Sequence, residues 1–149
     1  MRSLFDPAER EPIMSRLKKL QATSPRQWGK MDAAQMLAHC AAALESACTD
    51  TPQKQALIGR ILGPLVRKSA LGEKPFRKNS PTNPAFVVAD QRDFSKERQR
   101  LEAAVEHFCR RGAASVDQRK HVFFGTMSGD EWGRLMYKHL DHHLRQFSA

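Results

Sequence analysis

The sequence predicts an all-α fold, and three observations carry that prediction. Apolar residues recur at helical spacing in five separate segments. Helix start and stop signals flank most of these segments. The one run of β-branched character, Phe86-Val87-Val88, is too short to predict a strand. Four substantial helices and one short helix favour a helical bundle with a long crossover loop.

The first two helices have the clearest roles in such a bundle. The first is expected from about Pro7 to Leu20, because Asp6 is a good N-cap and proline suits the first helical position. The second is expected from Met31 to about Cys48 and is apolar almost all round. A helix without a polar face is usually central in its domain, so we expect it at the centre of the core.

The other three helices are bounded by breakers and caps. The third is expected from about Gln53 to Lys68, with a kink or end at Gly63-Pro64 because proline removes a backbone donor. The fourth is expected from about Asp93 to Arg111, terminated by Gly112. The last is expected over Trp132 to Phe147, after the capping box Ser128-Gly129-Asp130-Glu131.

Two long connections separate these helices. The stretch from Ser69 to Asp90 has no helical period and is longer than ordinary connections. It is therefore expected to be functional or to carry the crossover between distant helix ends, and the sequence leaves its role open. A second loop is expected from Ala113 to Met127.

Length and composition indicate one globular domain over residues 1–149. The hydrophobic fraction is 40%, and no apolar run approaches the roughly 20 residues that a membrane helix needs. The first residues lack the apolar core of a secretory signal, so a cytoplasmic location is expected. Three cysteines without a C-x-x-C pair argue against a disulfide framework or a structural zinc site.

The net charge of +9 raises the question of nucleic-acid binding. The basic residues are spread along the chain, and the two Trp, one Tyr and eight Phe form no nucleic-acid-binding signature with them. A solvated basic surface is the simpler interpretation, and nucleic acid is not expected as a partner. The charge does favour small anionic ligands.

Three of the six histidines predict a metal site. His139 and His143 are four residues apart on the last helix, a spacing that lets two imidazoles share one ion. Such a pair is common by chance on helix surfaces. His39, however, lies in the helix without an exposed face, where an unpaired imidazole is costly to desolvate. If the two helices are neighbours, His39, His139 and His143 form a site with open coordination positions.

The residues around this site exclude several other chemistries. Leu140 follows His139, so the H-E-x-x-H pattern of zinc proteases is absent, and Cys40 points about 100° away from His39 on its helix. No G-x-S-x-G, Walker or Rossmann motif is present. Tyr137 and Lys138 are candidate general acids. Candidates for an outer coordination shell or for substrate contact, with ordinary polar or packing roles as the alternative, are Gln35, His121, Tyr137 and His142.

Across most of its length the chain resembles the DinB superfamily, and more closely a small branch of it known as a domain of unknown function. The last of the matching stretches is the most specific. The stretches are WGKM (28–31), QMLAHC (35–40), LGEKPF (71–76), KNSPT (78–82), HVFFG (121–125), EWGRL (131–135) and YKHLDHHLRQF (137–147).

The resemblance implies a DinB-like four-helix bundle that holds a divalent metal, commonly nickel, zinc or iron, on His39, His139 and His143. Some relatives resemble S-transferases or isomerases that use a low-molecular-weight thiol such as glutathione, mycothiol or bacillithiol. Many others have no assigned activity. The implied reaction is therefore the least specific part of the resemblance.

Two functions from different classes follow as expectations. The first is a metal-dependent enzyme in which the ion activates water or a low-molecular-weight thiol, giving S-transferase or hydrolase-like chemistry on a small anionic or thiol-linked substrate. The second is a non-catalytic, stress-associated bundle that binds a metal or another ligand. No membrane partner is expected, and the sequence leaves open a homodimer, the identity of the metal and the substrate.

Overall fold

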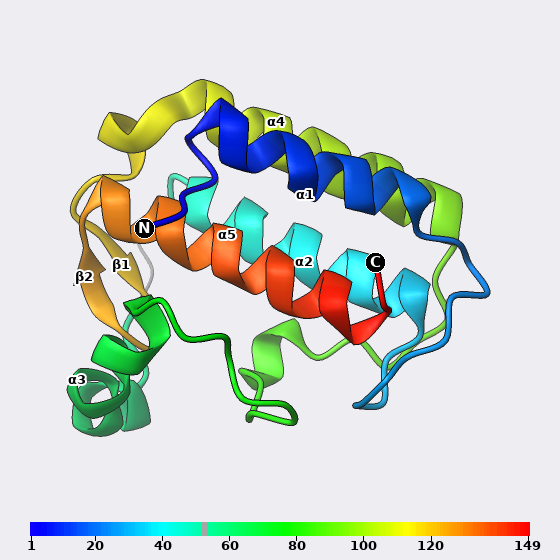
Figure 1. The fold of residues 1–149 in the computed structure, drawn as a ribbon. Helices are drawn as coiled ribbons and strands as arrows, with labels where there is room; N and C mark the ends of the chain where they lie inside the picture. The colour runs from blue at the N-terminus through cyan, green and yellow to red at the C-terminus, as the bar shows by residue number, and fades with distance from the viewer. Residues whose placement is uncertain (52–53) are drawn as a thin grey trace.

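The computed structural model describes residues 1–51 and 54–149. This part of the chain is mostly helical, with five α-helices, one short 3₁₀ helix and a two-stranded sheet (Figure 1). In chain order the elements are α1 (Pro7–Lys19), α2 (Ala33–Cys48), α3 (Leu57–Leu71), η1 (Pro84–Phe86), α4 (Phe94–Val116), β1 (Arg119–His121), β2 (Gly125–Met127) and α5 (Gly129–Gln146).

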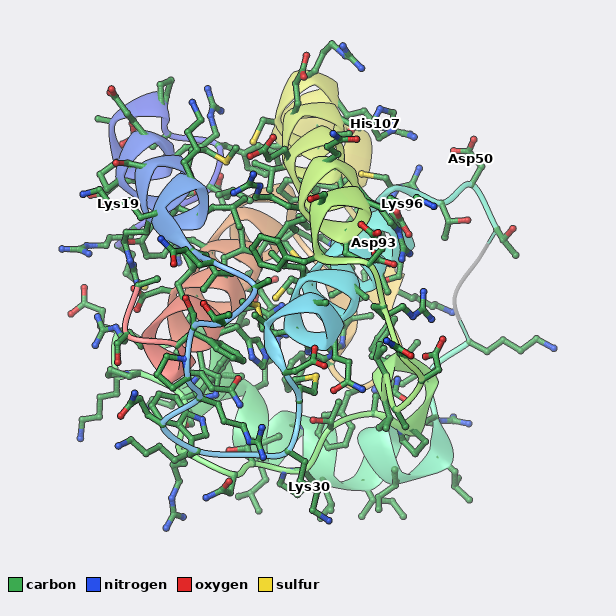
Figure 2. All side chains as sticks on the ribbon, turned by 90° about the vertical axis from the view of Figure 1, so that its right-hand side faces the viewer. Lys19, Lys30, Asp50, Asp93, Lys96 and His107 are labelled. Carbon is green, nitrogen blue, oxygen red and sulfur yellow. The ribbon has the colours of Figure 1, made fainter. Side chains whose placement is uncertain are left out.

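Helices α1, α2, α4 and α5 run alongside one another in two layers, with α1 and α4 above α2 and α5 in Figure 1. Figure 2 views these helices nearly end on and places α3 apart from them, along the lower edge. The predicted central position of α2 is confirmed, because α2 packs against both α4 and α5 and twelve of its sixteen residues are buried. One apolar cluster joins the four helices and includes Leu17, Leu37, Phe108 and Trp132.

Side-chain caps fix where α1, α2, α4 and α5 begin, and at α4 the cap is Asp93, which accepts from the backbone N–H of Lys96. Asp6 accepts a hydrogen bond from the backbone N–H of Ala8, and proline follows at the first helical position, as predicted. At α5, Ser128 and Glu131 form the predicted capping box. At α2 the structure adds a second capping box, between Asp32 and Gln35, so this helix begins at Ala33 and not at Met31. These contacts satisfy backbone donors that have no partner within the helix.

Two predicted helix breakers, Pro64 and Gly112, do not end their helices. The third helix continues through Pro64 to Leu71, because the proline lies on an exposed side where water can reach the carbonyl that loses its helical partner. Its predicted start at Gln53 lies outside the described residues. At Gly112 the α4 backbone leaves helical geometry, with φ +74°, but a further helical stretch follows to Val116. Glycine therefore kinks this element, where the sequence predicted its end.

The all-α prediction missed a small antiparallel hairpin between α4 and α5. Strand β1 pairs with β2 so that His121 lies opposite Gly125 and Arg119 opposite Met127. Each strand has only three residues, too few to show the alternation that predicts a strand from sequence. The hairpin matters because it supports α3, which contacts both β2 and α5.

The long connection between α3 and α4 passes beside the ends of α2 and α5 (Figure 1). Residues 84–86 form η1, which Asn83 caps and which contacts α2. The predicted crossover loop therefore brings its own backbone next to α2. No helix within the described residues is long and apolar enough to cross a membrane.

Candidate metal centre

His39, His139 and His143 lie together between α2 and α5. One potential ligand atom from each of the three side chains lies within 4.8 Å of the other two. The Nε2 atoms of His39 and His139 are 2.9 Å apart, and the ring centroid of His143 lies 4.7 Å from that of each other histidine. The structure therefore places the predicted trio at one point, close enough to hold a metal ion together.

Two of the rings are oriented by hydrogen bonds at the nitrogen that faces away from the cluster. His39 donates from Nδ1 to the Phe86 carbonyl oxygen, 2.8 Å away. His143 donates from Nδ1 to Oε1 of Gln146, 2.9 Å away. A neutral imidazole has one N–H, so both bonds leave an Nε2 lone pair unprotonated. This hydrogen-bonding pattern is typical of histidines that ligate metals.

The Gln146 amide is itself held in place. Its Nε2 donates to the Trp28 carbonyl oxygen at 2.7 Å, which leaves Oε1 facing His143. The backbone N–H of Gln27 in turn donates to the carbonyl of Gln146. The loop between α1 and α2 thus fixes a side chain of α5 that fixes His143.

The cluster is electrostatically neutral at physiological pH. Burial and the neighbouring His39 lower the pKa of His143 to about 3. Burial also lowers the pKa of His39, although the hydrogen bond to Phe86 opposes the shift. Loss of hydration and the surrounding imidazoles hold the pKa of His139 well below its usual range. Because only neutral imidazole ligates a metal, the trio stays in its binding form well below pH 7.

No carboxylate or thiolate completes this group among the described residues. Asp141 lies between His139 and His143 in sequence, but its carboxylate binds Arg16 at 2.6 Å and Arg145 at 2.9 Å. Cys40 is buried beside Met36, and burial raises the pKa of its thiol. Three neutral nitrogens could bind a metal ion and leave coordination positions for a further ligand.

Aromatic rings and two lysines surround the cluster on its loop side. The His142 ring lies 5.1 Å from His143, 5.5 Å from Trp28 and 5.8 Å from Phe76, measured between centroids. Lys78 Nζ sits 4.7 Å above the Trp28 ring, and Lys138 Nζ sits 4.6 Å above Phe76. The α1–α2 loop with Trp28, the α3–α4 loop with Phe76 and Lys78, and α5 with Lys138 and His142 therefore form an aromatic and positively charged rim.

The other predicted contact residues have different surroundings. Gln35 belongs to the α2 capping box and donates to the Asp90 carbonyl at 3.1 Å, so it ties the long loop to α2. The hydroxyl of Tyr137 accepts a hydrogen bond from Arg2 at 2.9 Å. Lys138 donates to the carbonyls of residues 69, 70 and 72, where it holds the C-terminal end of α3.

His121 is half-buried at the hairpin, outside the cluster. Its Nδ1 accepts hydrogen bonds from the backbone N–H groups of Phe123 and Phe124, so its proton is on Nε2. The ring stacks on Phe124 and lies 5.4 Å from Trp132, measured between centroids. Burial lowers its pKa to about 4.

The sequence reasoning missed the residues that orient the ligands. Gln146 follows His143 by three residues, so helix geometry could have identified it as a neighbour on the same face. The Phe86 carbonyl carried no sequence signal, because any residue supplies a backbone acceptor there.

Comparison with known proteins identifies the family of this chain but assigns it no activity. No curated protein matches the chain. No solved structure matches it either. A family model does match, over residues 5–149, and its description is "Protein of unknown function (DUF1569)". Because that match spans nearly the whole chain, this protein belongs to the DUF1569 family.

Proposed function

We propose that this protein is a metal-dependent enzyme of the DinB type. In this proposal α1, α2, α4 and α5 form the DinB-like four-helix bundle, and His39, His139 and His143 hold nickel, zinc or iron. The observation that carries the proposal is that the Nδ1 bonds of His39 and His143 leave their Nε2 nitrogens unprotonated within one neutral cluster, where the Nε2 atoms of His39 and His139 lie 2.9 Å apart. An ion there would supply Lewis acidity to water or to a low-molecular-weight thiol.

The chain's own residues would bind and orient the second reactant. Lys78 lies on the rim and is exposed, so it can attract an anionic group toward the cluster. Trp28 and Phe76 offer apolar ring faces beside it. The proposed substrate class is therefore a small anionic or thiol-linked molecule, which the net charge of +9 also favours.

A second candidate is a metal-binding bundle without catalysis. It is favoured by what surrounds the cluster in the described part of the chain, where no carboxylate is grouped with the three histidines. The candidate general acids Tyr137 and Lys138 are also engaged by Arg2 and by the end of α3. This candidate predicts stabilisation by metal without turnover.

Metal analysis of the purified protein tests what both candidates share. Wild-type protein should carry about one equivalent of a divalent metal, and the His139→Ala, His143→Ala double variant should lose nearly all of it. His107→Ala is the matched control, because His107 is exposed on the outer side of α4 (Figure 2). Equal metal content in the double variant and the control would refute the three-histidine site.

Activity assays then separate the two candidates. Metal-loaded protein is incubated with a chromogenic electrophile and a thiol such as glutathione, with and without a chelator, and separately with an ester substrate. The enzyme proposal predicts turnover that falls in Lys78→Ala, while metal content stays unchanged. Full metal occupancy without thiol-transfer or hydrolytic turnover would favour the binding bundle.

A further inference from the structure

Helix α3 exposes most of the large apolar side chains that reach the surface. Of eight exposed large hydrophobic residues in residues 1–51 and 54–149, six lie on this one helix, between 38% and 78% exposed. In Figure 2, α3 lies along the lower edge of the molecule and its side chains point away from the other helices. These six residues, here called the α3 face, are Leu57, Ile58, Ile61, Leu62, Leu65 and Val66.

The opposite side of α3 is built from small residues that touch the hairpin. Gly59 and Gly63 are buried, and a Cβ added to either would lie 2.6 Å or 2.5 Å from the Phe123 carbonyl oxygen. Any larger residue would push the helix off the hairpin. The helix therefore buries its glycines and exposes its aliphatic side chains, whereas an ordinary surface helix buries its aliphatic side chains.

Hydrogen bonds from Arg67 and Lys138 hold α3 in this orientation. Arg67 donates to both carboxylate oxygens of Glu131, at 2.7 and 2.8 Å, and to the carbonyls of Phe124 and Thr126. Lys138 binds three carbonyls at the C-terminal end of the helix. Rotating α3 to bury its aliphatic face would break these contacts and place large side chains where only glycine fits. The α3 face is thus a fixed feature of the surface.

We propose that the α3 face binds the α3 face of a second copy of this chain, in an antiparallel two-fold pair. Ile58, Ile61 and Leu65 have the three- and four-residue spacing of a helix-pairing seam. A two-fold axis between Ile61 and Leu62 brings Ile58 opposite Leu65 and Ile61 opposite Leu62, with Leu57 and Val66 on the two flanks of the seam. In this register the central apolar side chains meet one another, which is the self-complementarity that an isologous interface requires.

The size of the face agrees with a dimer. The exposed fractions of the six side chains correspond to on the order of 600 Å² per chain, which is near the lower limit for a stable two-fold interface and at the upper end of the largest apolar patch on a typical monomer. Lys68 lies opposite Gln55 in this register, so the pairing places no like charges face to face at that point. Antiparallel α3 helices also oppose their dipoles favourably.

A membrane surface fits the face less well than a second copy. Helices that lie on membranes commonly carry tryptophan or phenylalanine on the apolar side and a lysine- and arginine-rich side toward water. The α3 face has no aromatic residue. The opposite side of the helix packs Gly59 and Gly63 against the hairpin. Binding to anionic vesicles is therefore kept as an outcome of the test.

Sedimentation analysis of the full chain tests the proposal. At about 50 μM, wild-type protein should have twice the chain mass of 16.9 kDa, and the Ile61→Glu, Leu65→Glu variant should have the mass of one chain. Val87→Glu is the matched control, because Val87 is 59% exposed and lies outside α3. It should remain dimeric. Circular dichroism of each variant establishes that it is folded.

Disulfide cross-linking of a cysteine variant tests the same contact if the glutamate double variant does not fold. Under mild oxidation, Ile61→Cys beside the two-fold axis should form a disulfide-linked dimer, whereas Val87→Cys should stay monomeric; the native cysteines are buried or half-buried. A monomeric wild-type chain at about 50 μM would overturn the proposal. So would a dimer that persists in the folded glutamate variant, or a monomer that sediments with phosphatidylglycerol vesicles.

Discussion

Two histidine environments lie along α5, and they differ in which ring nitrogen carries the proton. Near the C-terminal end, His39 and His143 donate from Nδ1 to acceptors outside the cluster, so their Nε2 nitrogens carry no proton. Near the hairpin, His121 accepts two backbone N–H bonds at Nδ1, which places its proton on Nε2. Both environments lower the pKa, to about 3 for His143 and about 4 for His121.

This comparison shows that burial and a depressed pKa do not distinguish a metal ligand from a packed ring. The distinguishing feature is the direction of the hydrogen bond at Nδ1, because that bond decides whether a lone pair is available for an ion. The second difference is that three histidine rings meet, two of them held by outward Nδ1 bonds, and within the described residues only the cluster has this arrangement.

The largest expected effect is loss of metal-dependent stabilisation in His39→Ala. An ion that binds only the folded chain should raise the melting temperature by on the order of 10 °C when metal is in large excess over its dissociation constant. His39→Ala should lose that gain, whereas His121→Ala should keep it even if its metal-free melting temperature falls. Thermal melts with metal and with chelator measure the difference, and an equal loss in both variants would remove the proposed distinction.

Gln146→Leu should have the next largest effect. It deletes the acceptor that orients His143, and loss of such a partner typically weakens metal affinity about 10- to 100-fold. Gln146→Glu retains an oxygen acceptor and serves as the conservative control. Competition titration with a metal-binding dye gives both dissociation constants. Unchanged affinity in a folded Gln146→Leu protein would show that His143 needs no partner.

Both histidine environments should make the free energy of unfolding of the metal-free protein depend on pH in the same direction. Their histidines stay neutral when folded but take up protons near pH 6.5 when unfolded, so acid favours the unfolded chain. Stability is lost as pH falls below about 6.5, by about 1.4 kcal/mol per pH unit for each such histidine. His143→Gln and His121→Gln should each reduce this slope by about that amount, as measured by urea unfolding in chelator between about pH 4.5 and 6. A steeper slope in either variant would contradict the pKa directions.

The smallest expected effect is that of Tyr137→Phe. Its hydroxyl is bound by Arg2 and is not part of the cluster, so metal content and affinity should not change. Elemental analysis beside wild type checks this. A large loss of metal would mean that Tyr137 reaches the centre in solution.

The sequence reasoning identified most of the fold because the strongest signals are local. The caps at Asp6 and Ser128 predicted the beginnings of α1 and α5, and the absence of a polar face predicted the central place of α2. The hairpin was missed because three-residue strands carry no period, and Pro64 was misinterpreted because an exposed helix side tolerates a missing hydrogen bond.

For the candidate site, residue type and spacing were enough to predict which histidines meet, but not what orients them. His39 stood out because it lies in a helix without an exposed face, and His139 and His143 because they are one turn apart. The Phe86 carbonyl and the Trp28 contact to Gln146 depend on loop paths set by tertiary packing. The exposed face of α3 likewise depends on which side its glycines press against the hairpin.

X-ray absorption at the zinc edge tests the central claim most directly. The protein loaded with zinc should show three imidazole nitrogens at about 2.0 to 2.1 Å, with the remaining coordination from light atoms and no sulfur. Substituting His39 should remove one imidazole contribution, and substituting His121 should remove none. A sulfur neighbour, or an imidazole count that falls in the His121 variant and not in the His39 variant, would contradict a centre formed by His39, His139 and His143.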